Sequence, residues 1–320
     1  SKGTSEIKEH TLESVTPQYL DYKNATKRKS TANRDRIAIN QLCDFIGYSK
    51  PIAEIDYLHI EGKSGLINHL RSKGYADSGI NITLRHLRTF FNWLYNKAKL
   101  IDEPIKFDMI NEGEKLYYYF SESELQAVYD YEGVNDKFKR FFYFYEQTGV
   151  RAIEPFIGEL LGDWLMVDSD KSKGKNVREI HLTEELKTIL KEMQSFRDSY
   201  KEMGSKRPNE AAYERISKML AKAVKGLNFQ GKKLTIKSFR HTYGIRRVFV
   251  TGNIFQVAME MGHKNVTTTQ LYLRFQADEI KDHFPSLAPI IENMENVQNN
   301  ITMGTKSMGT QYSNVNKLCT

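Results

Sequence analysis

Three short segments near the C-terminal end of the chain carry residue types suited to chemistry on a phosphate ester. They are Lys237-Ser238-Phe239-Arg240-His241, Met261-Gly262-His263 and Thr268-Thr269-Gln270-Leu271-Tyr272. A tyrosine hydroxyl is a poor nucleophile at neutral pH, so a protein that uses one against a phosphodiester must surround the phosphate with cations and hydrogen-bond donors. The order of a basic pair, a histidine and a tyrosine therefore indicates phosphoryl chemistry on DNA.

Two arginines are candidates to stabilise the charge that attack on a phosphodiester concentrates on its non-bridging oxygens. The guanidiniums of Arg151 and Arg240 each offer paired donors, in a geometry that lysine does not reproduce. Lys237 lies three residues before Arg240 at the start of a predicted helix, so both side chains share a face beside a helix N-terminus that favours anions. Arg151 has an alternative interpretation as a structural ion pair with Glu154, three residues further on.

The histidine and the tyrosine also have structural alternatives. His263 follows Gly262, where a helix is expected to end, and is consistent with a buried histidine satisfied by the backbone. Tyr272 lies among apolar neighbours and is consistent with a core tyrosine whose hydroxyl reaches water. Residue types alone leave both roles open.

A helical N-terminal domain must help to position these groups. Apolar residues at helical spacing predict it over residues 13–103, after a flexible N-terminus at residues 1–12. Ser30-Thr31 are expected to cap one helix, which Gly47 ends. In a later helix, Phe90-Phe91-Asn92-Trp93 is predicted to pack its aromatic rings in the core rather than to stack them on bases.

A second domain is predicted over residues 117–284, after a linker at residues 104–116 that begins with a helix-stopping proline. Its first helix starts at a capping box, Ser121-Glu122-Ser123-Glu124. Two β-prone runs flank a polar, glycine-containing turn and predict a hairpin. The runs are residues 164–168 and 177–182, and further helices are expected over residues 184–196, 210–224, 237–250 and 254–261. The chain is therefore predicted to be mainly α with one small β-sheet.

The composition changes after Phe284 and predicts a C-terminal helix with a disordered tail, residues 285–320. An amphipathic spacing supports this helix and is formed by Ile290, Ile291, Met294 and Val297.

The overall composition limits the class of protein. The chain has 320 residues, 40% of them hydrophobic, which is enough for two globular domains. A formal net charge of +7 favours nucleic acid or another polyanion as partner, although lysine-rich solvated faces produce the same balance. Two cysteines exclude a disulfide framework and a cysteine-based metal cluster. Without a long apolar stretch or a signal core, the chain is expected to be soluble and cytoplasmic, with no membrane partner.

Five blocks, in order, resemble the tyrosine recombinases of the phage integrase family. Thr148-Gly149-Val150-Arg151-Ala152-Ile153-Glu154 resembles the block with the first catalytic arginine and its supporting carboxylate. Lys173-Gly174-Lys175-Asn176-Val177-Arg178 resembles the hairpin with the catalytic lysine, at Lys173. Thr235-Ile236-Lys237-Ser238-Phe239-Arg240-His241-Thr242 resembles the block with the second arginine. Gly262-His263 matches the next dipeptide, and Tyr272, nine residues after His263, matches the nucleophile.

The resemblance covers residues 15–284 and implies a SAM-like core-binding domain and a catalytic domain that clamp DNA in a C shape. It implies site-specific cleavage and rejoining of DNA strands through a covalent 3′-phosphotyrosyl intermediate, as in the integration of mobile elements, without metal or other cofactor. The implied partners are double-stranded DNA with a recombination site, further copies of the chain in a tetramer, and accessory DNA-bending proteins. The implied catalytic residues are Tyr272, Arg151, Lys173, Lys237, Arg240 and His263, supported by Glu154 and Thr269.

Other cations are candidates for contacts with the DNA backbone. Arg246 and Arg247, on the predicted helix after Arg240, are also consistent with a solvated basic face. The full set is Arg85, Arg88, Lys175, Arg178, Arg246 and Arg247.

Two positions depart from the family pattern. Most recombinases have histidine where Lys237 stands, and lysine keeps a charge and a donor but switches protonation less readily near neutral pH. Lysine there is similar to the type IB topoisomerases, so a DNA-relaxing enzyme is the first alternative, and a catalytically silent DNA-binding relative is the second. Pro155 stands where the family has an apolar helix former, so the backbone after Arg151 is expected to be unusual.

Overall fold

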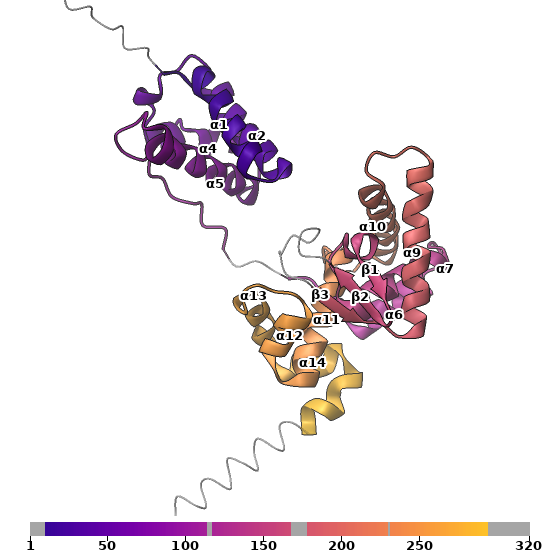
Figure 1. Ribbon diagram of the computed structural model, residues 1–320. Coiled ribbons are helices and arrows are strands. Elements are labelled where there is room, and N and C mark those ends of the chain that lie inside the picture. The colour runs from indigo at the N-terminus through magenta and orange to yellow at the C-terminus, as the bar shows by residue number, and fades with distance from the viewer. Residues whose placement is uncertain (1–9, 114–116, 168–177, 230, 294–320) are drawn as a thin grey trace, which may run out of the picture. The chain divides into compact units, whose positions relative to one another are not determined.

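The chain forms two compact units, each with its own hydrophobic core (Figure 1). The computed structural model describes residues 10–113, 117–167, 178–229 and 231–293. The units are Ser1–Lys115 and Leu116–Thr320, so the division falls inside the linker expected at residues 104–116.

Helices build the first unit. α2 packs against both α1 and α5, and Figure 1 shows these helices with α4 as one bundle. The elements are α1 (Leu12–Thr26), α2 (Lys29–Ile46), the 3-10 segment η1 (Ile52–Glu54), α3 (Leu58–Glu61), α4 (Leu66–Ser72), α5 (Asp77–Trp93) and the π-helical turn η2 (Leu94–Ala98).

The aromatic residues of α5 belong to the core, as predicted. Phe90 and Phe91 are fully buried, and the ring of Trp93 lies 5.3 Å from that of Tyr19. The prediction for the start of α2 is wrong. That helix begins at Lys29, so Ser30 lies in its first turn, where it cannot act as the N-cap residue.

The second unit is mainly helical with one small sheet, which confirms the predicted fold class. α9 and α10 extend beyond their predicted ends, and Tyr200 and Leu227 in these extensions pack against the core. The elements are α6 (Glu122–Asp130), α7 (Asp136–Thr148), α8 (Glu154–Ile157), β1 (Glu159–Leu161), β2 (Trp164–Val167), β3 (Arg178–His181), α9 (Glu184–Glu202), α10 (Pro208–Leu227), α11 (Ile236–Thr251), α12 (Ile254–Glu260), α13 (Thr267–Gln270), η3 (Leu271–Arg274), α14 (Ala277–His283) and η4 (Pro285–Leu287).

The sheet has three antiparallel strands in the order β1-β2-β3, one more than the predicted hairpin. β1 pairs with β2 across a two-residue connection, Gly162-Asp163, and Gly162 has a φ of 58° that favours glycine. A glycine-aspartate pair between two apolar runs is a known hairpin signal. β1 is only three residues long and has no buried residue, so its periodicity was too weak to predict it.

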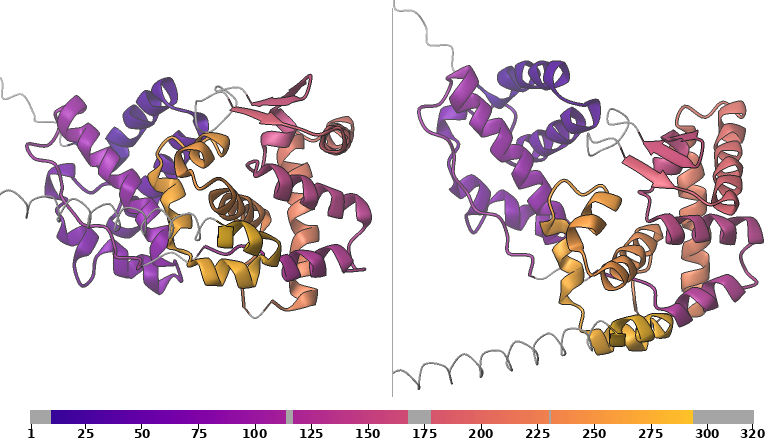
Figure 2. Two further views of the ribbon diagram at one scale, coloured as in Figure 1. Left: turned by 90° about the horizontal axis from the view of Figure 1, so that it is seen from below. Right: turned by 60° about the horizontal axis from the view of Figure 1, so that its bottom comes forward.

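α11 lies between the two halves of the second unit's core. On one side, Phe239 stacks on Phe120, with 4.6 Å between ring centroids, and α7 packs alongside. On the other side, Ile245 and Val248 share a cluster with residues of α12, η3 and α14. Figure 2 shows α12, α13 and α14 grouped on the side of α11 away from α7 and α9. Residues from distant parts of the chain therefore meet on α11.

The beginning and the end of the described second unit pack together. The Tyr119 ring stacks on that of Phe284, and its hydroxyl lies 2.6 Å from His283 Nδ1. Residues 288–293 are helical, and Ile291 is buried in the same unit, whereas Ile290 is partly exposed. Of the four residues expected on the C-terminal helix, Met294 and Val297 lie outside the described residues.

Pro155 has a simple structural role. It lies in the first turn of α8, where a proline removes no helical hydrogen bond and its fixed φ suits the helix. The unusual backbone expected after Arg151 is therefore a short helix that begins at Glu154. Among the described residues, no helix is both long and apolar enough to cross a membrane.

Candidate functional site

A buried carboxylate organises the cations of the second unit. Glu154 Oε1 accepts a hydrogen bond from Arg151 Nη1 at 2.7 Å, and Oε2 accepts from the Arg151 backbone N–H at 2.7 Å. Arg178, from β3, donates its Nη1 to the same Oε2 at 2.5 Å. The side chains of Glu154 and Arg178 are both 4% exposed, whereas that of Arg151 is 30% exposed. Arg151 is thus held in place with part of its guanidinium at the surface.

Two arginines meet at the ends of helices α7 and α12. Arg240, from α11, donates Nη1 to the carbonyl of Gly149 at 2.5 Å and Nη2 to the carbonyl of Met261. Arg151 donates Nη2 to the carbonyl of Gly262 at 2.6 Å. Carbonyls at helix C-termini carry partial negative charge, so they suit guanidiniums. The blocks that contain Arg151, Arg240 and Gly262, far apart in the sequence, therefore meet in space.

The cluster contains more positive than negative charge. Arg151 and Arg178 share the carboxylate of Glu154, and burial, with repulsion from Arg178 and Arg151, lowers the pKa of the neighbouring Arg240 to about 9. Burial alone would raise the pKa of Glu154, but attraction by Arg178 and hydrogen bonds from Arg151 lower it below its usual value. The site therefore favours an additional anion, which would relieve the repulsion among the guanidiniums.

His263 lies beside this cluster and has a fixed orientation. Its Nδ1 is 2.7 Å from the hydroxyl of Thr269, which is fully buried in α13. Burial, with repulsion from Arg240 and Arg151, lowers the pKa of His263 to about 4, so the ring is neutral at pH 7. The Thr269 bond determines which ring nitrogen remains available for another partner.

Tyr272 is enclosed against α11. Its side chain is 1% exposed, and burial raises the pKa of its hydroxyl above the usual value, although Arg240 acts in the opposite direction. A Cβ built on Gly244 would lie 2.4 Å from Cε2 of the tyrosine ring, so glycine makes room for this ring. The hydroxyl lies 3.1 Å from His241 Nδ1, and the Tyr117 ring also packs against that of His241, with 5.3 Å between ring centroids.

The structure brings together most residues predicted for the site. The group linked by these contacts comprises Arg151, Glu154, Arg240, His263, Thr269 and Tyr272. Lys237 is exposed in the first turn of α11, whereas Arg240 is buried. Lys173 and Lys175 lie outside the described residues. The sequence pattern did not single out His241, although its position four residues after Lys237 places it on the same helix face.

Arg178, one of the cations expected to contact DNA, lies inside the fold. It is buried, pairs with Glu154 and donates Nε to the carbonyl of Glu260 at 2.9 Å. Its Nη2 is also buried and has no hydrogen-bond partner among the described residues. Arg178 therefore supports the site from below its surface.

The other described cations that were expected to contact DNA also make contacts within the fold. Arg246 pairs with Glu146 at 2.6 Å, and Arg247 makes two bonds to Glu260 at 2.7 and 2.8 Å. Arg85 and Arg88 are exposed, and each donates one guanidinium N–H to a backbone carbonyl. Each of these four arginines is held by at least one contact within the fold.

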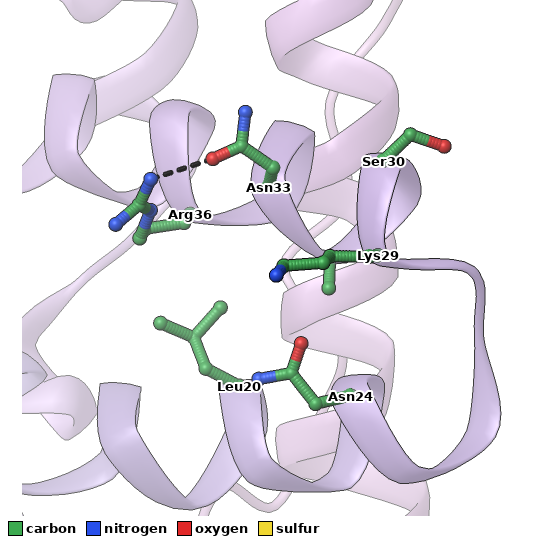
Figure 3. Close-up of a pocket in the computed structure, with 7 residues that line it drawn as sticks. Leu20, Asn24, Lys29, Ser30, Asn33 and Arg36 are labelled. Atoms are coloured by element: carbon green, nitrogen blue, oxygen red, sulfur yellow. Dashed lines mark hydrogen bonds between the residues drawn. The ribbon is translucent and has the colours of Figure 1, made fainter. Parts of the chain in front are cut away.

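A polar pocket of about 430 Å³ lies between α1 and α2 of the first unit (Figure 3). Arg36 donates Nη2 to the side-chain oxygen of Asn33 at 2.6 Å, and the amine of Lys29 lies on the same wall. The lining residues are Leu20, Asn24, Lys29, Ser30, Ala32, Asn33 and Arg36.

The surface around this pocket is basic. Residues 22–41 include six cations and one acid, Asp35, which is buried against Lys23 at 3.1 Å and His86 at 2.6 Å. This run of cations is visible in the sequence and indicates an anion-binding face. None of the residues predicted from the sequence to contact DNA lies in it. Among the described residues, no group of three or more histidine, cysteine, aspartate or glutamate side chains could hold a metal ion.

Known proteins resemble this chain in sequence and in fold. No protein-family profile matches it. It is 25% identical over 216 residues to the tyrosine recombinase XerC of Caldanaerobacter subterraneus subsp. tengcongensis, a match that covers 61% of this chain. The match spans only 59% of that relative's length.

Three solved structures share the fold. The Tn1549 transposon integrase in complex with transposon right end DNA has a TM-score of 0.63 at 16% identity, covering 85% of this chain and 98% of that chain. A lambda integrase dimer bound to a COC′ core site gives 0.64 at 16% identity, covering 82% and 95%. A lambda integrase tetramer bound to a Holliday junction gives 0.63 at 16% identity, covering 83% and 78%. The chain is thus similar in sequence to a curated tyrosine recombinase, and it shares its mainly helical fold with solved integrases.

Proposed function

We propose that the protein is a site-specific recombinase that cleaves and rejoins DNA through a covalent 3′-phosphotyrosyl intermediate on Tyr272. The surplus of buried positive charge beside this tyrosine is the observation that carries the proposal. Three guanidiniums and one carboxylate form a site that gains stability when an anion enters. A phosphodiester of DNA supplies that anion at the position where a nucleophile is available.

The arginines would stabilise the transition state. As the Tyr272 oxygen approaches phosphorus, negative charge accumulates on the non-bridging oxygens, and preorganised donors lower the energy of that state. Arg151, 30% exposed and fixed by Glu154, can offer its outward N–H groups to one oxygen. Arg240 supplies positive charge from within the fold, and Lys237 stands exposed on the same helix. His263, fixed by Thr269, is placed to donate a further hydrogen bond.

Strand cleavage also needs a proton for the departing 5′ oxygen, because an alkoxide is a poor leaving group. Lys173 is proposed for this role. The bond to Tyr272 retains the energy of the broken phosphodiester, so the 5′ hydroxyl of a partner strand can attack it and release the tyrosine. Cleavage and joining are then nearly isoenergetic.

The proposed partner is double-stranded DNA with a recombination site. The basic pocket of the first unit, with Lys29 and Arg36, has the cations and amides that contact phosphates. Exchange between two duplexes requires four tyrosines, so we propose a tetramer on DNA, helped by DNA-bending proteins. The match to a lambda integrase tetramer bound to a Holliday junction supports this assembly.

A covalent-trapping experiment tests the proposal. Cleavage sites are first mapped on DNA that flanks the protein's own gene, and a duplex with that site is then nicked so that cleavage releases a short fragment and prevents rejoining. The wild-type protein should form a protein–DNA adduct that resists denaturant, whereas Tyr272→Phe should form none. Absence of an adduct with the wild-type protein on every such duplex contradicts the proposal and favours a DNA-binding relative without activity.

Lys237 favours one rival, a type IB topoisomerase, because lysine at this position is similar to those enzymes. Relaxation of supercoiled plasmid by a protein that remains monomeric on DNA, with no exchange between two duplexes, would support the rival. Recombinant products from two duplexes, together with a tetrameric complex in sedimentation, would support recombination.

A further inference from the structure

A histidine outside the expected catalytic set lies against the hydroxyl of Tyr272. His241 Nδ1 is 3.1 Å from that hydroxyl, and the two rings meet edge to face with 6.0 Å between centroids. Gly244, further along α11, leaves the space into which the tyrosine ring fits. The hydroxyl is thus held at the imidazole by packing on α11.

The imidazole is in the state that accepts a proton. Burial lowers the pKa of His241 to about 4, and repulsion from Lys237, Arg240 and His263 contributes to the shift. The ring is therefore neutral at pH 7. When the proton of a neutral imidazole is on Nε2, Nδ1 is an acceptor, and a phenol O–H can donate to it.

We propose that His241 Nδ1 accepts the proton of Tyr272 as the tyrosine oxygen attacks the phosphorus of DNA, an inference that rests on the proposed function. The Oη–H bond breaks and its electron pair forms the bond from oxygen to phosphorus. The bond from phosphorus to the 5′ oxygen breaks, and that oxygen takes a proton from a separate acid, for which Lys173 is proposed above. In the joining step His241 returns its proton to the tyrosine, as microscopic reversibility requires.

The neighbouring groups are less suited to this task. An ammonium has three donors and no acceptor, so Lys237, in the position where most recombinases have histidine, does not accept the proton in its charged form. His263 has its Nδ1 bonded to Thr269 rather than to the tyrosine. His241 lies one helical turn after Lys237. It therefore supplies an imidazole close to the position where most recombinases have histidine and this chain has lysine.

Arrival of DNA strengthens His241 as a base. The charged and titratable groups that face it are Lys237 and Arg240 on α11, His263 after α12, Tyr272 on η3 and Tyr117 before α6. The cations lower its pKa in the absence of DNA. A phosphodiester adds a negative charge among them, so the pKa of His241 rises toward the value that favours proton transfer.

The test is the single-turnover rate of covalent-adduct formation on the nicked duplex, measured against pH with the full-length protein. His241→Asn keeps an oxygen near the position of Nδ1 but accepts no proton at these pH values. It should bind DNA as the wild-type protein does and react about 100-fold more slowly. The wild-type rate should fall as pH falls through the pKa of His241, because the protonated ring no longer accepts. In the variant this acid limb should disappear.

A second measurement separates proton transfer from structural damage. Replacement of Tyr272 by a difluorotyrosine gives a more acidic phenol, which needs a base less. It should restore much of the rate of His241→Asn, whereas a variant that is merely misfolded gains nothing. Lys237→His combined with His241→Asn should also regain activity if an imidazole in either position can serve.

The outcomes distinguish this inference from the proposed function. An unchanged rate and pH profile for His241→Asn, with Tyr272→Phe inert, overturns the role of His241 and leaves the recombinase proposal intact. Failure of difluorotyrosine to restore a slow His241→Asn variant also overturns it. If the wild-type protein forms no adduct, the proposed function fails and this inference fails with it.

Discussion

At the scale of single residues, one missing carbon determines where the ring of Tyr272 lies. A Cβ on Gly244 would be 2.4 Å from Cε2 and 2.6 Å from Cζ of that ring, distances that real Cβ atoms do not show. Gly244 has an ordinary helical backbone, so space rather than conformation requires glycine here. The tyrosine hydroxyl and its neighbour His241 therefore depend on a residue that carries no functional group.

Gly244→Ala should displace the tyrosine and slow adduct formation by about 100-fold, the cost of a misplacement of about 1 Å. Alanine normally stabilises a helix interior relative to glycine by about 0.5–1 kcal/mol, so an inactive variant need not be a less stable one. Adduct formation on the nicked duplex and urea unfolding measure the two effects.

The matched control is Gly79→Ala in α5, where a Cβ meets only Tyr75, at 4.0 Å. That variant should react at the wild-type rate. Wild-type activity of Gly244→Ala would show that the ring can shift without consequence.

The residue types and their order predicted phosphoryl chemistry, but the contacts of each side chain in the fold were needed to propose its individual role. Arg151, Arg240, His263 and Tyr272 could be selected because their order along the chain is distinctive. Arg178 could not be assigned from the sequence, since an arginine on a hairpin is equally suited to solvent and to the buried Glu154. His241 was hidden because only the fold brings Tyr272, 31 residues away, to its side.

At the scale of elements, the segment from the end of α12 to η3 holds both His263 and Tyr272. It contains only short helices, α13 and η3, which gain little stability from their own hydrogen bonds. The bond from His263 Nδ1 to Thr269 therefore links the start of the segment to the turn before the tyrosine. A change at Thr269 should affect both functional side chains.

Thr269→Val keeps the volume of the side chain and removes its hydroxyl. The partly buried ring of His263 then loses the partner of its Nδ1, which should lower the free energy of unfolding by about 1 kcal/mol and slow adduct formation. Thr268→Val, at the exposed neighbouring position, is the control and should change neither quantity. Equal behaviour of the two variants, measured by urea unfolding and by trapping, would argue against a role for this hydrogen bond.

Elements with strong periodicity or capping signals could be predicted, and weak ones could not. The capping box at Ser121 and Glu124 begins α6, as the sequence indicated. β1 escaped prediction because its three residues bury no side chain, so its place depends on pairing with β2. Such pairing is a tertiary effect that periodicity does not record.

At the scale of the whole molecule, the net charge of +7 comes from cations whose ion pairing differs between the two units. Several arginines of the second unit pair with carboxylates, whereas the basic run at residues 22–41 of the first unit has its only acid, Asp35, buried. Charge that is not neutralised within the fold remains available to DNA phosphates. The first unit should therefore contribute much of the salt-dependent part of DNA binding.

Lys29→Ala with Arg36→Ala should weaken DNA binding and reduce the slope of log K against log salt by about 2, one for each phosphate contact removed. Fluorescence anisotropy of a labelled duplex over a range of salt concentrations measures the slope. Lys191→Ala, on the exposed face of α9 next to Glu192, is the control and should leave it unchanged. Equal slopes for the double variant and the control would exclude this pocket as a DNA contact.

The first residues of the second unit limit where the chain can be cut to prepare that unit as a fragment. Tyr117 packs its ring on His241, Tyr119 on Phe284, and the Phe120 N–H donates to Thr242 on α11 at 2.9 Å. These residues follow the linker, and they contact α11 or the cluster that contains Tyr272. A fragment of the second unit cut after Phe120 would lose this support, so an isolated catalytic fragment must begin no later than residue 117.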